Sequence, residues 1–150
     1  MPDVMAGAKF ERFFREAAGL DVDKSDRKRY LEFIQQKIED LVVRAEAIAK
    51  ANGRDIIQPH DLPITKGLQE CLYEYRRIDK GLNIGPILDK LTPWPPTDLA
   101  YSVETEAYFP VVAGALSVAL ARSFKIIDPH LKNPESEHWE RSFEVFGLLL

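Results

Sequence analysis

Cysteine is almost absent from this sequence, since Cys71 is the only one among 150 residues. A single cysteine excludes a disulfide within the chain, which suits the reducing environment of the cytoplasm. Leu68, Leu72 and Tyr75 lie near it at helical spacing. These neighbours indicate that Cys71 is a small buried side chain rather than a nucleophile.

The residue patterns that carry catalysis or hold a metal ion are also missing. The three histidines, His60, His130 and His138, do not pair with one another or with the cysteine at the spacing of a zinc site. No glycine-rich phosphate loop, nucleophile elbow or spaced pair of carboxylates is present. We therefore predict a protein that is not an enzyme and that uses no cofactor or metal ion.

The sequence lacks an excess of positive charge. Its 20 basic and 24 acidic residues give a formal net charge of −4. Residues 1–78 hold 14 of each sign, whereas residues 79–150 hold 6 basic and 10 acidic residues. Because proteins that bind DNA usually carry a basic excess, we expect any nucleic-acid surface to be local and to lie in the first half.

Long apolar runs are missing as well. No stretch approaches the ~20 apolar residues that a membrane-spanning helix needs. The first five residues show no basic region followed by an apolar segment, so no signal peptide is expected. These observations predict a cytoplasmic protein without a membrane partner.

What the sequence does contain is helical periodicity. The first half predicts a short helix over residues 9–18, a long helix from about 26 to 52, a short extended segment at 55–58 and a helix from about 63 to 78. Phe10, Phe13 and Phe14 form an apolar stripe on the short helix. Ser25 or Asp26 is the expected N-terminal cap of the long helix.

The second half repeats this plan. It predicts a short helix over residues 84–91, a proline-rich break at 92–96, a long helix from Val103 to about Ile127 and a last helix from Ser136. A shift of 78 residues places Tyr30 on Tyr108. We expect an all-α protein with two tandem units, residues 1–80 and 81–150, that close into one compact domain. An ordinary helical bundle with accidental symmetry is the alternative.

Three segments of the first unit resemble an archaeal histone. Phe10–Gly19 is similar to the first histone helix, and Ala49–Arg54 is similar to the end of the median helix. Arg54 and Asp61 match the histone pair whose salt bridge ties the second loop to the third helix. The whole chain resembles a bacterial histone-like family with two histone folds in one chain. This resemblance implies two short–long–short helical units that cross as an intramolecular histone pseudodimer, and hence a monomer.

The chain also departs from the histone pattern. Asp55 and Ile56 stand where histones place a lysine and a threonine near phosphate, and a carboxylate repels phosphate. The second unit has Lys132 and Trp139 in place of the Arg–Asp pair. Neither end of the sequence carries a basic tail. These departures argue against histone-like compaction of DNA.

Seven basic residues are candidates for contact with DNA. They are Arg12, Arg15, Lys24, Arg27, Lys28, Arg29 and Arg54. In the resembled family, basic residues at these places face the duplex. The alternative is that they are solvated charges, paired with neighbouring carboxylates such as Glu11, Glu16 and Asp26.

Two roles follow for the chain. We expect a structural or protein-interaction module that binds duplex DNA weakly and without sequence preference, if at all. The alternative is a nucleoid-associated DNA-binding protein that uses the basic residues of the first unit. The sequence names no protein partner.

Overall fold

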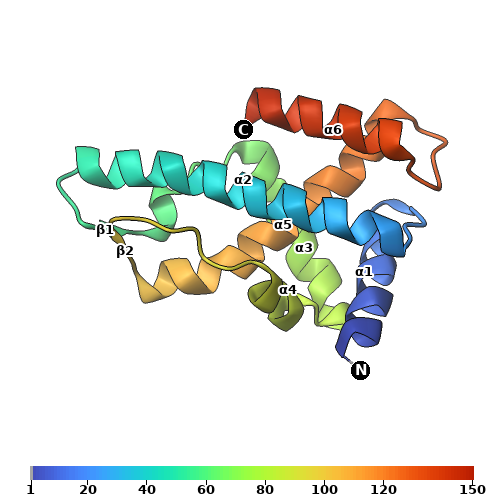
Figure 1. Cartoon of the computed structure of the whole chain (residues 1–150), viewed down its shortest axis with the longest axis horizontal. Helices are drawn as coiled ribbons and strands as arrows, with labels where there is room; N and C mark the ends of the chain where they lie inside the picture. The colour runs from blue at the N-terminus through green and yellow to red at the C-terminus, as the bar shows by residue number, and fades with distance from the viewer. Residues whose placement is uncertain (1) are drawn as a thin grey trace.

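The computed structural model describes residues 2–150, with the side chains of residues 7–150 (Figure 1). Its elements are α1 (Pro2–Ala18), α2 (Lys24–Ala51), β1 (Ile56–Ile57), a 3-10 turn (Pro59–Asp61), α3 (Lys66–Leu82), α4 (Gly85–Leu91), β2 (Ala100–Tyr101), α5 (Val103–Ile127) and α6 (Ser136–Leu149). The two strands have only two residues each. The predicted all-α class is confirmed.

The ends of several helices differ from the sequence-based expectation. The cap of α2 is Asp23, whose carboxylate accepts hydrogen bonds from the N–H groups of Ser25 and Asp26. Helix α3 begins after Thr65, which caps it, and continues to Leu82. Side-chain caps shift easily by a residue or two in sequence reasoning, because several polar residues near a helix start can serve.

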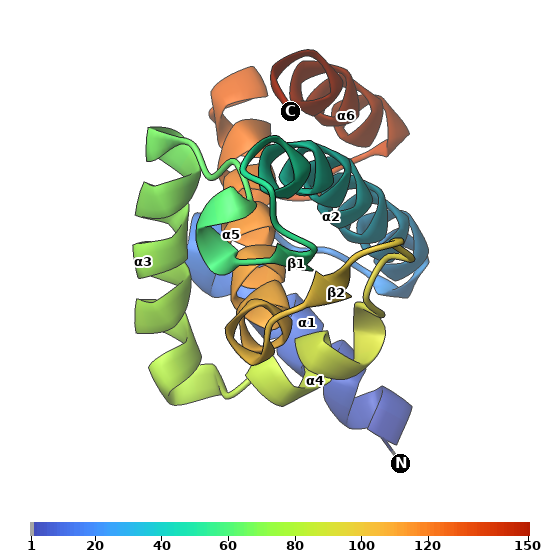
Figure 2. The ribbon, with the colours of Figure 1, turned by 90° about the vertical axis from the view of Figure 1, so that its left-hand side faces the viewer.

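Helix α5 forms the centre of the molecule, and the other five helices pack against it (Figure 2). Among residues 2–150 it is also the helix long and apolar enough to cross a membrane, contrary to the expectation that no segment qualifies. More than half of its apolar stretch is buried inside the protein. Such burial is typical of a central core helix that its neighbours cover over much of its surface.

Helices α2 and α5 bury matching positions when they are offset by 79 residues. The matched pairs are Asp26 and Thr105, Tyr30 and Phe109, Phe33 and Val112, Ile34 and Ala113, Lys37 and Leu116, Ile38 and Ser117, Leu41 and Leu120, Val42 and Ala121, and Ala45 and Phe124. The caps Asp23 and Ser102 have the same separation. The internal shift is therefore one residue longer than the 78 expected from the sequence.

The loops at the ends of the two long helices meet in pairs. After α2, β1 pairs in parallel with β2, the strand that precedes α5. At the opposite end, the N–H of Asp21, before α2, donates to the carbonyl of Lys132, after α5, at 2.7 Å. The loop that follows each long helix thus contacts the loop that precedes the other.

Polar and aromatic contacts fix how the helices cross. The hydroxyls of Tyr30 on α2 and Ser117 on α5 are 2.7 Å apart and buried. Phe14 on α1 packs against Tyr30 and Trp139, with ring centroids 5.5 and 6.3 Å apart. The aromatic stripe predicted for the first helix therefore joins the core between α2 and α6.

Candidate nucleic-acid interface

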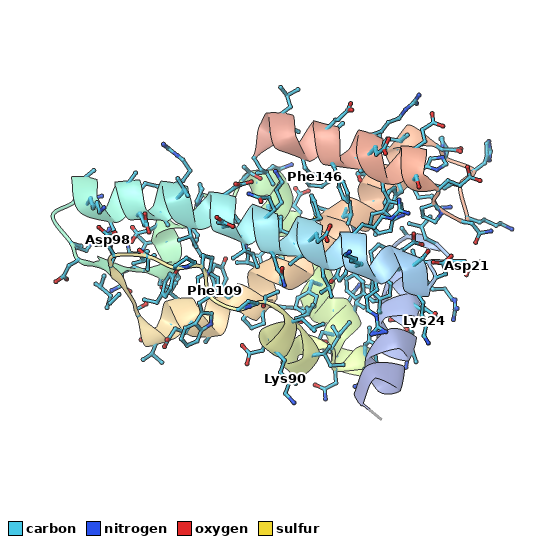
Figure 3. The ribbon with its side chains drawn as sticks, in the orientation of Figure 1. Asp21, Lys24, Lys90, Asp98, Phe109 and Phe146 are labelled. Atoms are coloured by element: carbon cyan, nitrogen blue, oxygen red, sulfur yellow. The ribbon has the colours of Figure 1, made fainter. Side chains whose placement is uncertain are left out.

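The structure does not bring all seven candidate basic residues together. Lys24, near the start of α2, lies at one end of the molecule, while Asp98 marks the other end (Figure 3). Helix α2 has 28 residues, which corresponds to about 42 Å at ~1.5 Å per residue. Arg54 follows the far end of α2, so it does not belong to the same local surface as Lys24.

Arg12 and Arg15 on α1 are exposed but have acidic neighbours. Arg12 forms a salt bridge with Glu16, with nitrogen and oxygen 3.0 Å apart. Arg15 lies 3.7 Å from the carboxylate of Asp21. Exposed pairs of this kind are weak, so the arginines can still meet phosphate, but the nearby carboxylates lower the local positive potential.

Arg29 has a structural position that sequence reasoning missed. Its guanidinium donates to the hydroxyl of Ser136 at 3.0 Å, at the start of α6. It also lies over the ring of Trp139, 6.0 Å from the centroid. Arg29 thus links α2 to α6 and is not directed at a free surface. No local signal could show this link, because the two residues of the hydrogen bond are 107 positions apart.

The four basic residues at the start of α2, Lys24, Arg27, Lys28 and Arg29, have different surroundings. Arg27 is half-buried and borders a small hollow beside Phe10 and Leu88. Lys24 and Lys28 are exposed and lie four residues apart, on one face of the helix. Only these two members of the run are fully presented to solvent.

The structure adds Lys132 to this end of the molecule. Its carbonyl accepts the hydrogen bond from Asp21, three residues before Lys24, and Lys132 is itself exposed. The sequence interpretation placed Lys132 in the second unit and gave it no part in the basic surface. We define the basic end as Lys24, Lys28 and Lys132.

Acidic side chains lie within the basic end. The carboxylate of Asp23 caps α2, and its hydrogen bond with the Ser25 hydroxyl lowers the pKa of Asp23. Asp26 is buried, and burial raises the pKa of its carboxyl group. A charged Asp23 next to Lys24 weakens the attraction of this surface for phosphate.

Arg54 and Asp61 form a bidentate salt bridge. Two guanidinium nitrogens of Arg54 lie 2.6 and 2.7 Å from the two carboxylate oxygens of Asp61. Asp61 is fully buried and also accepts the N–H of Gln58 at 2.8 Å. The hydrogen bonds from Arg54 lower the pKa of Asp61, and the same pairing raises the pKa of Arg54.

This pair ties the loop after α2 to the 3-10 turn before α3. Arg54 also donates to the carbonyl of Ile56 at 3.2 Å, beside β1. Because its guanidinium is directed inward at Asp61, it offers little to a phosphate. The arrangement favours a structural role for Arg54 over the DNA-binding role also considered for it.

The part of the chain that the structure describes contains no group of three or more histidine, cysteine, aspartate or glutamate residues placed to hold a metal ion. Cys71 is buried, and desolvation raises the pKa of its thiol. A buried thiol with a raised pKa is a poor nucleophile.

Comparison with known proteins assigns the chain to a family. Residues 10–147 match the model described as "Domain of unknown function (DUF1931)", and the chain belongs to that family. A crystal structure from Thermus thermophilus is similar, with 55% identity and a TM-score of 0.85 over 95% of this chain and 97% of that one. A crystal structure from Aquifex aeolicus has a TM-score of 0.84 over 97% of this chain and 95% of that one, with 22% identity, and shares the fold.

Two relatives in Aquifex aeolicus (strain VF5) carry the description "Uncharacterized protein". One is 25% identical over 108 residues, which are 72% of this chain and 63% of that protein. The other is 33% identical over 76 residues, which are 49% of this chain and 45% of that protein. The matches therefore span less than two-thirds of the length of these relatives.

Proposed function

We propose that the chain is a fused pair of histone folds that acts in the cytoplasm as a structural or protein-interaction module and binds duplex DNA weakly at most. The observation that carries the first part is the match of buried positions between α2 and α5 at an offset of 79 residues. The meeting of the loops at both ends adds a second, independent sign of internal two-fold symmetry. An accidental bundle would not be expected to repeat caps, burial and loop contacts together.

The proposal of weak DNA binding rests on the contacts that the candidate basic residues make. Arg29 binds α6, and Arg54 binds Asp61. Arg12 and Arg15 have carboxylate neighbours. The small basic end, Lys24, Lys28 and Lys132, lies at one end of a chain whose net charge is −4. Since affinity for DNA grows with the number of phosphates neutralised, this surface supports weak binding.

The pseudodimer predicts a monomer at micromolar concentration. Each long helix buries its apolar face within the same chain, so folding needs no second copy. Sedimentation equilibrium should give a mass close to 17.1 kDa. A stable dimer or tetramer at micromolar concentration would contradict the proposal that one chain by itself forms the complete pseudodimer.

Binding to duplex DNA is expected to be no tighter than the roughly 10⁻⁴–10⁻⁶ M of nonspecific contact at physiological salt. The basic end and its neighbours can neutralise only a few phosphates, so the slope of log affinity against log salt should be no steeper than about −4. A mobility-shift titration at two salt concentrations measures both quantities. Submicromolar binding at physiological salt would instead favour the nucleoid-associated role.

Charge reversal can locate any binding seen at low salt. The triple variant Lys24→Glu, Lys28→Glu and Lys132→Glu should abolish it. Lys66→Glu is the control, because Lys66 is exposed on α3 and already pairs with Glu70. If the control weakens binding as much as a single reversal in the basic end, the DNA surface lies elsewhere.

A further inference from the structure

One histidine side chain contacts both ends of the loop between α5 and α6. His138 lies in the first turn of α6, and its side chain is 18% exposed. Its Nδ1 accepts a hydrogen bond at 3.0 Å from the N–H of Glu135, the residue that caps α6. Its Nε2 lies 3.7 Å from a carboxylate oxygen of Asp128, the residue that follows α5. The ring therefore stands between the first and the last residue of this loop.

The two neighbours of the ring define the protonation state that fits. The N–H of Glu135 can only donate, so Nδ1 of His138 accepts and carries no proton in this arrangement. The single ring proton is then on Nε2, which faces the carboxylate of Asp128. The other oxygen of that carboxylate accepts the N–H of His130 at 3.2 Å, which helps to hold Asp128 in place. These contacts fit a neutral imidazole with its proton on Nε2.

The start of α6 is a capping box in which histidine takes an unusual place. In such a box, the third residue of the helix accepts the main-chain N–H of the cap residue, and glutamate or glutamine is the usual choice. Here the third residue is His138 and the cap is Glu135. An imidazole titrates near pH ~6.5 in peptides, so histidine exchanges its acceptor for a donor close to neutral pH, whereas glutamine does not.

We propose that His138 makes the start of α6 sensitive to pH: the neutral ring closes the capping box, and protonation of Nδ1 opens it. The added proton points at the N–H of Glu135, so a donor and an acceptor become two donors. The N–H then loses its partner, and the first turn of α6 loosens. This segment includes Lys132, which contacts Asp21, and Ser136, which contacts α2. The inference goes beyond the proposed function and does not depend on DNA binding.

Asp128 opposes this effect but is too weak to cancel it. Its carboxylate attracts a protonated ring, yet the two groups are 3.7 Å apart and the side chain of Asp128 is 43% exposed. Ion pairs with such exposure contribute little. The Nε2 proton already faces this carboxylate in the neutral ring, so protonation adds no hydrogen bond there. The net effect of protonation is therefore the loss of the contact at Nδ1.

Other charged groups on the elements that pack around the start of α6 also respond to pH or to the charge of the ring. They are Arg15 on α1, Asp21 and Lys132 in the loops, Asp26 and Arg29 on α2, Lys125 on α5, and Glu137 and Arg141 on α6. Burial raises the pKa of Asp26, so this carboxyl group adds a pH dependence of its own. All these groups are shared by the wild type and a variant at position 138. A comparison of the two proteins therefore isolates the imidazole.

Replacing His138 with glutamine tests the proposal, because glutamine keeps an acceptor in the capping box but does not titrate. Melting temperatures are measured at about pH 7.5 and about pH 5.5, on either side of the imidazole titration. The wild type should lose about 2–4 °C more than His138→Gln between these two values. His130→Gln is the matched control, because His130 is exposed in the same loop and bonds Asp128 through its main chain. It should lose as much as the wild type.

Hydrogen exchange at the main-chain N–H of Glu135 gives a direct measurement. After correction for the intrinsic effect of pH, its protection in the wild type should fall severalfold over this range, and in His138→Gln it should stay constant. Unchanged protection in the wild type would overturn the proposal, whatever the stability of the variant. Equal losses of melting temperature in the wild type and His138→Gln would also overturn it. A wild type that gains stability in acid relative to the variant would show that attraction to Asp128 dominates, which contradicts the proposal.

Discussion

Replacing Gly114 with alanine is expected to lower the free energy of unfolding by about 2–3 kcal/mol. Gly114 lies in the middle of α5, and a Cβ atom there would be 2.3 Å from two ring carbons of Tyr75. The ring of Tyr75 is itself buried, so it has no free space to move into. The clash should outweigh the ~1 kcal/mol that alanine gains over glycine in a helix. Urea denaturation measures the difference.

A glycine in α3 provides the control. Gly67 has no atom within 4 Å of the position that a Cβ would take. Gly67→Ala should therefore raise stability by about 0.5–1 kcal/mol through helix propensity alone. In a Tyr75→Leu background, Gly114→Ala should cost clearly less than in the wild type, because the ring carbons are gone. Equal costs in both backgrounds would show that Tyr75 is not the obstacle.

Removing the carboxylate of Asp61 is expected to cost about 3–5 kcal/mol of folding stability. Asp61→Ala leaves the Gln58 N–H without its acceptor and deprives Arg54 of both short hydrogen bonds. Thermal and urea denaturation measure the loss. Asp98→Asn is the control, because Asp98 is 70% exposed and pairs with an exposed Lys50, and it should change little. A melting temperature for Asp61→Ala close to that of the control would disprove the structural role.

The same pair should make stability depend on pH in acid. Hydrogen bonds from Arg54 lower the pKa of Asp61 in the folded state, so the unfolded state takes up a proton first as pH falls. The stabilisation is present above the unfolded carboxyl pKa of about 3.9 and is lost as pH falls through the lower folded value. Asp61→Asn should be less stable than the wild type at neutral pH and should show a flatter decline below about pH 4. A parallel decline in both proteins would assign the acid sensitivity to other carboxylates.

The helices could be predicted from the sequence because their signals are local. The spacing of Phe10, Phe13 and Phe14 and the proline-rich break before α5 place elements without knowledge of the rest of the chain. Local signals did not determine the internal offset. Helix α5 is apolar around most of its surface, so its stripe fits an offset of 78 or 79 nearly equally well in sequence. Only burial in the folded structure distinguishes the two.

The candidate site was harder to predict, because the partners of charged side chains lie far along the chain. Arg27, Lys28 and Arg29 look alike in sequence, yet Lys28 is exposed, Arg27 borders a hollow near α1 and Arg29 binds α6. Lys132 reaches the basic end only because the loop after α5 meets the loop before α2. The sequence pattern of α6 would equally allow Leu148 and Leu149, which are exposed, to be buried in a core.

The amino-acid sequence alone determined the helical class, the order of the helices and the Arg54–Asp61 pairing expected from the histone resemblance. Hydrophobic periodicity acts over a few residues, so it can be recognised without the fold, whereas the pairing followed from the resemblance alone. The tertiary structure decided which basic residues face solvent, at which glycine a Cβ atom would clash, and which apolar side chains remain exposed. Those properties depend on which surfaces become buried where α2 crosses α5. The residues in contact there are distant in sequence, so local patterns do not reveal them.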